Sequence, residues 1–145
     1  MAEYEHENRA EEDRCIQAYK DIIKQRRDNR QDVAAIIIEP ISAFENHIAT
    51  PYFYRQVRRI AKENGIPFIV DETKTGVGST GKFWALEHWN LDDAADLVTF
   101  GQRSGISGFF STHEYRLIEG PDSICFQQNA DIVKLLNFGI TWKYI

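Results

Sequence analysis

The sequence predicts an α/β fold built on a mostly parallel sheet. Three observations support this prediction. Strand-like and helix-like stretches alternate along the chain, the run VAAIIIEP (33–40) is continuously apolar, and the segment after it has a clear helical period. A continuous β-branched run is typical of a strand covered on both faces, and such strands are usually parallel. In such a fold, sites lie at the carboxyl ends of the strands.

The first thirty residues predict an amphipathic helix with nearly balanced charge. Their apolar side chains recur at helical spacing, at Cys15, Ala18, Tyr19, Ile22 and Ile23. The chain therefore begins with an N-terminal helix, and the α/β core is expected to occupy residues 31–116.

A second helix should follow VAAIIIEP, because its boundaries are clearly marked. Thr50 can cap its start, Pro51 suits the first helical position, and Gly65 ends it. Its apolar stripe consists of Phe53, Val57, Ile60 and Ala61. The two strand-like runs are thus joined by a helix, as in a parallel crossover.

Three further strands are predicted, at IPFIVDE (66–72), DLVTF (96–100) and GFFST (108–112). Beyond Arg116 the pattern weakens, and only a modest helix around Asp131 to Phe138 is expected. We therefore expect a single segment, residues 1–145, that ends in a divergent tail over 117–145.

Composition excludes several classes of function. The net charge of −5 disfavours nucleic acid, and the cluster of Arg55, Arg58 and Arg59 is expected to be a solvated helix face. No run approaches the roughly 18 apolar residues of a membrane span. The opening MAEYEHENRAEED is too acidic for a secretory signal or a transit peptide. The scattered cysteines and histidines predict no metal site and no disulfide framework.

The stretch GVGSTGKFW (76–84) has the GxxxxGK spacing of a phosphate-binding loop. Such a loop needs a Ser or Thr after its Lys to bind magnesium, and it should directly follow a strand. Here Phe83 follows Lys82, and the residues DETKT separate the loop from the strand. The sequence therefore disfavours a nucleotide site.

Two carboxylates, Asp71 and Glu72, end the second predicted strand. From position alone, capping of the following turn is the favoured explanation. However, three stretches follow one another in the same order as similar motifs in a known family. They are VAAIIIEPI, IPFIVDETKTGVGSTGKFWALEHWNLDDAADLVTF and GFF. From about Glu11 to Arg116 the chain resembles the large domain of class III pyridoxal-phosphate aminotransferases, and among them the enzymes that act on 4-aminobutyrate.

The resemblance implies a fold, a cofactor and site residues. The fold would be an incomplete three-layer segment of the fold-type I large domain, and the cofactor would be pyridoxal phosphate (PLP). In the family, the Asp of VDE pairs with the pyridine nitrogen of PLP, and Asp71 matches it. Glu39 matches the Glu of the EP motif, which pairs with a substrate-handling arginine. The glycine-rich loop would be a turn toward a subunit interface.

Several positions depart from the family pattern. Gln102, thirty-one residues past Asp71, stands where the family has its Schiff-base lysine, and Arg103 follows it. An amide cannot condense with an aldehyde, and a protonated arginine is no nucleophile. Lys74 stands where the family has Gln beside the cofactor ring oxygen. AFEN is one residue shorter than the corresponding family segment. The family also has an NTW stretch that contacts the cofactor phosphate, and this sequence has no counterpart of that stretch after Arg116.

These departures leave three functional hypotheses. The chain could share the family's transamination of 4-aminobutyrate with 2-oxoglutarate, act as a pseudoenzyme that binds a partner, or be a truncated gene product. The missing lysine argues against turnover. A further hypothesis is that Lys74 replaces the missing lysine and forms the imine with PLP. The alternatives are that Lys74 is a solvated lysine in a turn or that it forms an ion pair with Glu72.

The resemblance also implies expectations about partners and location. The family sheet has about seven strands and only four are predicted here, so apolar surface should remain uncovered. We expect an oligomer or docking on another subunit, with the N-terminal helix and residues 84–89 as candidate contacts. The family implies a mitochondrial location, whereas the N-terminus as written implies a cytoplasmic one.

Overall fold

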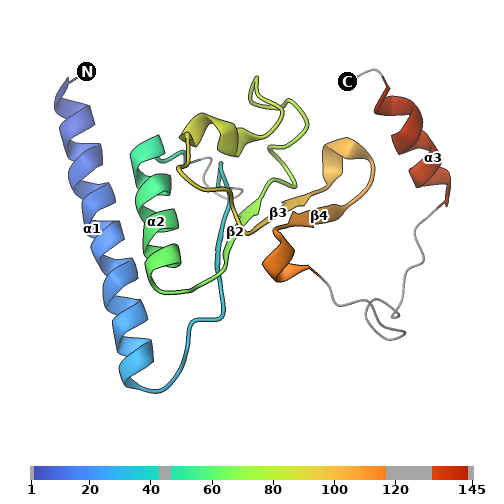
Figure 1. Ribbon diagram of the computed structural model, residues 1–145. Coiled ribbons are helices and arrows are strands. Elements are labelled where there is room, and N and C mark those ends of the chain that lie inside the picture. Colours follow the sequence, from blue (N-terminus) through green and yellow to red (C-terminus); the bar gives the residue numbers. More distant parts are fainter. Residues whose placement is uncertain (1, 43–46, 117–131, 144–145) are drawn as a thin grey trace.

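The computed structural model describes residues 2–42, 47–116 and 132–143. Within these ranges, a four-stranded sheet has the order β1-β2-β3-β4. Strands β1 (Ile36–Ile38), β2 (Phe68–Asp71) and β3 (Leu97–Phe100) are parallel, and β4 (Gly108–Ser111) pairs antiparallel with β3. The α/β prediction with a mostly parallel sheet is confirmed (Figure 1).

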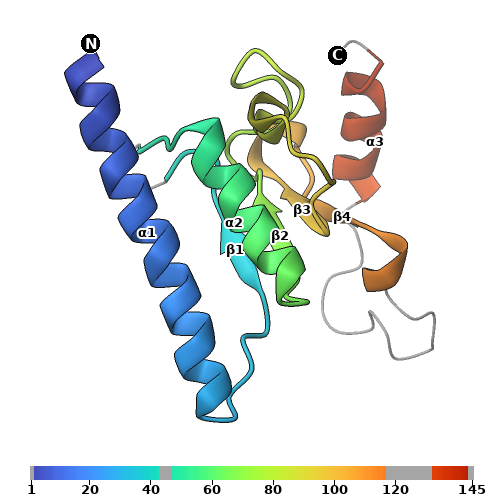
Figure 2. The ribbon, with the colours of Figure 1, turned by 60° about the vertical axis from the view of Figure 1, so that its left-hand side comes forward.

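Helices stand on both sides of this sheet. Helix α1 (Ala2–Asp28) lies beside α2 (Pro51–Glu63), which packs on β2, while α3 (Ile132–Thr141) stands at the far side near β4 (Figures 1 and 2). Short 3-10 helices η1 (Ala85–Trp89), η2 (Gln102–Ser104) and η3 (His113–Tyr115) interrupt the connections. No helix within the described ranges is long and apolar enough to cross a membrane.

The N-terminal helix forms as predicted, but it uses a different stripe. Ile16 and Ile23 are buried and Tyr19 packs against the same core, whereas Ile22 is 53% exposed. Positions 16, 19 and 23 share one helical face because they are separated by three and four residues, and that face meets α2. Ala18 and Ile22 are exposed, while Cys15 is half-buried.

Helix α2 agrees closely with the prediction. Val57, Ile60 and Ala61 are buried, and Gly65 has φ +66° after the helix ends. The role predicted for Thr50 is wrong in one respect. Thr50 occupies the N-cap position, but its hydroxyl donates to Glu12 Oε2 over 2.7 Å instead of capping α2. The Glu12 carboxylate also accepts from the Thr50 N–H, so it joins α1 to α2.

Strand β1 differs from the prediction in length and in cover. Only Ile36–Ile38 of the run VAAIIIEP is a strand, and its burial is one-sided: Ile36 is buried while Ile37 is 62% exposed. The expectation of cover on both faces is therefore wrong for this chain. The reason is that α1 and α2 pack on a single face, and no element in the described ranges covers Ile37.

The core lies between α1, α2 and the sheet. Phe68, Val70 and Val57 are fully buried, and the rings of Tyr54 and Trp89 stack with centroids 3.8 Å apart. Trp89 is thus enclosed by the chain itself. The candidate partner contacts over residues 84–89 stay a prediction.

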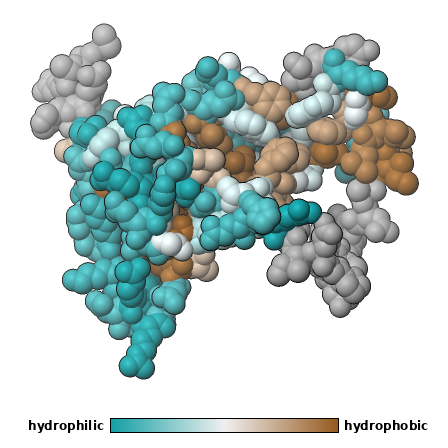
Figure 3. Space-filling view, in the orientation of Figure 1, coloured by the Kyte–Doolittle hydropathy of each residue, from teal (hydrophilic) through white to brown (hydrophobic). Residues whose placement is uncertain are grey.

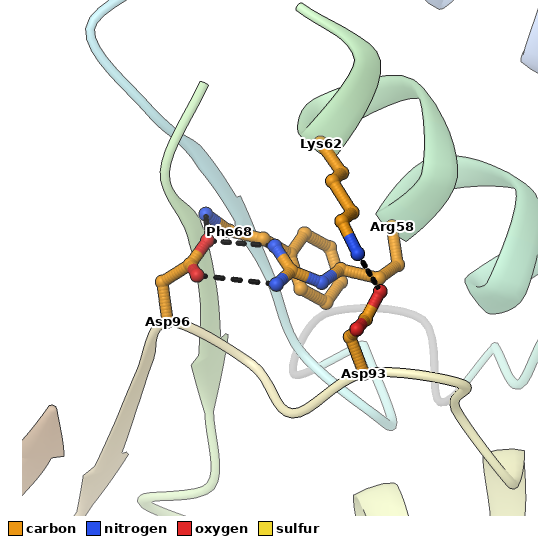
Figure 4. Close-up of polar contacts among 5 residues, drawn as sticks. All are labelled: Arg58, Lys62, Phe68, Asp93 and Asp96. Carbon is orange, nitrogen blue, oxygen red and sulfur yellow. Dashed lines mark hydrogen bonds and ion pairs between the residues drawn. The ribbon is translucent and has the colours of Figure 1, made fainter. Parts of the chain in front are cut away.

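The predicted solvated arginine face is also wrong in part. Arg58 donates to both Asp96 oxygens, over 2.7 and 3.1 Å, and the side chains of this pair are only 11% and 14% exposed (Figure 4). Asp96 Oδ2 additionally accepts from the Phe68 N–H. Arg55 donates to the Trp89 carbonyl, so only Arg59 is an exposed arginine of this cluster.

The predicted C-terminal helix is observed as α3, whose bounds extend to Thr141. The part of the predicted tail over 117–131 lies outside the described residues. This range includes Cys125 and residue 131, where the helix was predicted to begin. In the described part of the chain, no group of three or more His, Cys, Asp or Glu side chains could hold a metal ion.

Candidate functional site

Three strand ends bring the predicted site residues to one edge of the sheet. The parallel register pairs Ile38 with Val70 and Asp71 with Thr99, so β1, β2 and β3 end at the same edge. Glu39 follows β1, Asp71 ends β2, and Gln102 follows β3 after Gly101. The structure therefore places Glu39, Asp71 and Gln102 at the edge where an α/β sheet has its sites.

Asp71 is held by three hydrogen bonds to one carboxylate oxygen. Its Oδ1 accepts from the Thr73 N–H over 3.0 Å, from Thr73 Oγ1 over 2.7 Å and from Thr99 Oγ1 over 2.8 Å. Oδ2 takes no part in these bonds. One oxygen thus orients the carboxylate, and the second is left for other contacts.

The pKa of Asp71 favours the charged form. Partial burial raises this pKa, but the hydrogen bonds from Thr73 and Thr99, together with the charge of Lys74, outweigh the burial. The result is a pKa below the ordinary value of an aspartate. Asp71 is therefore an oriented, half-buried anion at neutral pH.

Glu72 has a structural role. Its side chain is 1% exposed; Oε2 accepts from the Thr75 hydroxyl, and Oε1 accepts from the Leu86 N–H over 2.7 Å. Both carboxylate oxygens are used to fold the loop that leads to η1. Glu72 forms no ion pair with Lys74 within the described residues, so that alternative for Lys74 is wrong.

Lys74 is exposed in the turn after β2, and its charge acts on Asp71. This exposure agrees with the alternative that Lys74 is a solvated lysine in a turn. Lys74 also lies only three residues after Asp71 in the sequence. The hypothesis that Lys74 forms an imine stays a prediction.

The glycine-rich loop does not have the geometry of a phosphate cradle. The N–H of Gly76 donates to the Glu72 carbonyl, that of Gly78 to Phe83, and that of Gly81 to Gly78. These donors are used within the loop, and the helix that follows is a five-residue 3-10 helix. A Cβ atom at Gly76 would lie 2.8 Å from the Trp84 ring, so glycine permits the loop to fold onto that ring.

Gln102 lies in η2, in a turn that packs against the turn after Asp71. A Cβ atom at the buried Gly101 would be 3.3 Å from Thr73 Cγ2 and 3.2 Å from Ser107 Oγ. The Gln102 side chain is exposed. The structure thus brings the segments of Asp71 and Gln102 into contact, and it places a neutral amide at this position.

Sequence reasoning missed the two threonines that hold Asp71. Thr73 could have been found from its place two residues after an aspartate, where a side chain and backbone N–H commonly meet the carboxylate. Thr99 required the strand register, which pairs it with Asp71. Neither residue was identified from the motif alone.

Comparisons with known proteins agree on a family. A sequence model of the family described as Aminotransferase class-III matches residues 1–119. The chain is 46% identical over 118 residues to the mitochondrial 4-aminobutyrate aminotransferase of Sus scrofa, and 47% identical over 117 residues to the 4-aminobutyrate aminotransferase of Dictyostelium discoideum. Each alignment covers 80% of this chain and 23% of the relative, so the chain spans about a quarter of their length.

Solved structures have similar folds. A transaminase from the marine bacterium Virgibacillus matches 92% of this chain and 32% of its own, with a TM-score of 0.71 at 20% identity. The lysine aminotransferase of M. tuberculosis matches 55% of this chain and 18% of its own, with a TM-score of 0.52 at 31% identity. The chain therefore shares part of its fold with aminotransferases.

Proposed function

Because this chain belongs to the class III aminotransferase family, we propose that it is a 4-aminobutyrate aminotransferase-like protein that binds PLP without transaminating. In this proposal Asp71 pairs with the pyridine nitrogen of PLP, and no lysine replaces the missing amine at position 102. The single observation that carries the proposal is the oriented, ionised Asp71 carboxylate beside a turn that bears Gln102.

The residues at the sheet edge fit the nitrogen end of PLP. A carboxylate with a lowered pKa is charged at neutral pH, as a partner for a protonated pyridine nitrogen must be. When bound, PLP supplies an electron sink for the carbanion of a substrate. Here the role of Asp71 is to bind and orient the ring through the oxygen that Thr73 and Thr99 leave free of their hydrogen bonds.

The same edge of the sheet has no residue that could attach PLP covalently at position 102, where the family has its lysine. Gln102 offers an amide, and the guanidinium of Arg103 stays protonated, so neither side chain can condense with an aldehyde. Glu39, at the end of β1, is assigned to the substrate side by resemblance. Binding of the cofactor would therefore rest on noncovalent contacts, and turnover would lack its proton-transferring amine.

A mitochondrial location is part of this proposal. Its support is that the relatives from Sus scrofa and Homo sapiens have "mitochondrial" in their names. Fractionation of cells that express the protein from its own gene would test it, and recovery in the cytosol alone would contradict it.

A borohydride experiment on the full chain tests the proposal. After incubation with PLP and reduction, peptide mapping of the wild type should find no specific label at Lys74 or elsewhere near Asp71. The variant Gln102→Lys should gain a label at position 102, because it restores an amine there. Addition of Asp71→Asn to that variant should reduce this label.

Activity is the second readout. The wild-type chain should form no product from 4-aminobutyrate and 2-oxoglutarate above the level of Asp71→Asn. Sustained turnover by the pure wild type, or a specific label on Lys74, would overturn the proposal. A label on Lys74 that disappears with Lys74→Gln would favour the alternative in which that lysine replaces the missing amine.

A further inference from the structure

A pocket of about 320 Å³ lies between helix α3 and the body of the molecule. Its aromatic lining consists of Trp84, Phe100, Phe110, Phe138 and Trp142. Val77 and Ile106 complete the lining, so none of the side chains around the pocket is charged. Asp71 does not line it. The pocket is therefore separate from the candidate cofactor site and has a chemistry of its own.

The aromatic rings form two walls. In the body wall, Trp84 meets Phe110 with ring centroids 5.9 Å apart, and Phe100 stacks on Phe110 at 5.0 Å. In the helix wall, Phe138 and Trp142 lie with their centroids 4.9 Å apart. Among the described residues, no lining ring of one wall is in ring contact with a lining ring of the other. The pocket is thus a gap between two aromatic walls.

The helix wall lies outside the region that the family model matches, which ends at residue 119. It is held in place from beyond the gap, because Trp142 meets Phe83 with centroids 5.5 Å apart, and Phe83 does not line the pocket. Apolar side chains gather around α3, while the surface over α1 is hydrophilic (Figure 3). Phe110 and Trp142 are 55% and 45% exposed, so a bound molecule would cover apolar surface on both walls.

The backbone of Val77 is strained at this pocket. Its φ is +60°, in the left-handed region that a β-branched residue rarely adopts. The loop also lies close against Trp84, because a Cβ atom at the neighbouring Gly76 would be 2.8 Å from that ring. Strained residues persist only where the surrounding structure fixes them, and they are concentrated at active and ligand-binding sites. The strain is independent of the apolar lining, and it indicates a site shaped for a ligand.

We propose that this pocket binds a small neutral aromatic molecule of two fused rings, inserted between the body wall and the helix wall. The pocket has about twice the volume of the roughly 150 Å³ apolar cavity that takes up benzene. A charged ligand would lose its hydration without gaining a counter-charge, whereas a neutral ring system can stack on the wall rings or meet their edges. This inference goes beyond the proposed function and does not depend on cofactor binding.

Fluorine NMR of monofluorinated naphthalene, titrated with the full chain, tests this inference. The wild type should broaden the ligand signal saturably. Ile106→Trp fills the gap with a larger side chain, and Phe138→Ala removes a ring of the helix wall. Each variant should raise the dissociation constant at least about tenfold. Circular dichroism would verify that the variants keep the wild-type helix content, and Phe138→Ala alone decides the test if Ile106→Trp does not fold.

Phe109→Ala is a matched control. Phe109 precedes Phe110 in β4, is 45% exposed and does not line the pocket. Adjacent side chains of a strand point to opposite faces, so this variant should bind like the wild type. A wild type without saturable binding would overturn the inference, as would unchanged binding by a folded pocket variant or lost binding in the control. Saturable binding of tetramethylammonium in place of the naphthalene would overturn it in favour of a cation-binding aromatic cage.

Discussion

Thr99 Oγ1 donates a hydrogen bond to Asp71 Oδ1 over 2.8 Å, from β3 to the adjacent strand β2. This bond links the strand before Gln102 to the carboxylate that we assign to the cofactor nitrogen. Its acceptor oxygen is shared with both donors of Thr73. The orientation and charge of Asp71 therefore depend on two neighbouring strands, which only the folded sheet brings together.

The variant Thr99→Val should raise the pKa of Asp71. In the folded wild type this pKa lies below the ordinary 3.8, so Asp71 stabilises the fold above the unfolded-state pKa, and that stability is lost as the pH falls through the folded value. Thr99→Val should reduce the stability at neutral pH and flatten its decline below about pH 4. Carboxyl NMR titration of Asp71 and urea unfolding at several pH values would measure both effects.

Thr112→Val is a matched control for Thr99→Val, because the Thr112 hydroxyl makes no capping bond to η3. It should leave the Asp71 titration unchanged. An Asp71 pKa that does not move in Thr99→Val would refute the role we give to Thr99.

The ion pairs that α2 makes with Asp96 and with Asp93 should differ widely in their contribution to stability (Figure 4). Arg58→Met leaves Asp96 mostly buried and uncompensated, so we expect a loss of about 3 kcal/mol in the free energy of unfolding. Lys62→Met removes the pair with Asp93, whose side chains are 60% and 43% exposed and screened by water, and should cost far less than Arg58→Met. Equal losses in urea denaturation would contradict this ranking.

The contact between α1 and α2 should depend on Glu12 and not on its neighbour. Glu12 accepts from the N–H and the hydroxyl of Thr50, so Glu12→Ala removes both acceptors from the start of α2 and should cost about 1 kcal/mol. Glu11 pairs with Arg14 on its own exposed helix face, where water and salt screen the charges, so Glu11→Ala should leave the stability nearly unchanged. Thermal unfolding of the two variants would compare them, and a reversed order would argue against docking of α1 through Glu12.

Local patterns predicted helix α2 well, because its proline, its stripe and its terminal glycine all act within a few residues. The same reasoning failed for Arg58, whose partner Asp96 lies 38 residues away in the chain. It also failed for β1, because the exposure of Ile37 depends on which elements pack on the sheet. Long-range partners and missing cover have no local pattern in a sequence.

The candidate site was predicted in position and not in detail. The motif identified Asp71 and the departure at Gln102, and the parallel register brought both to one edge. The division of roles between Asp71 and Glu72 required the structure, because the partners of Glu72, Thr75 and Leu86, meet it only when the loop after β2 has folded. One is half-exposed at the edge, and the other is buried in the loop.

The central claim is that Asp71 binds the cofactor nitrogen without a covalent link to the protein. Calorimetric titration with PLP and with pyridoxine 5′-phosphate, which has no aldehyde, tests it most directly. We predict similar dissociation constants for the two ligands, and a weakening of both by about tenfold to a hundredfold in Asp71→Asn, since a charge-assisted hydrogen bond contributes about 1.5–3 kcal/mol. Binding of PLP alone, binding of neither ligand, or unchanged binding by Asp71→Asn would contradict the claim.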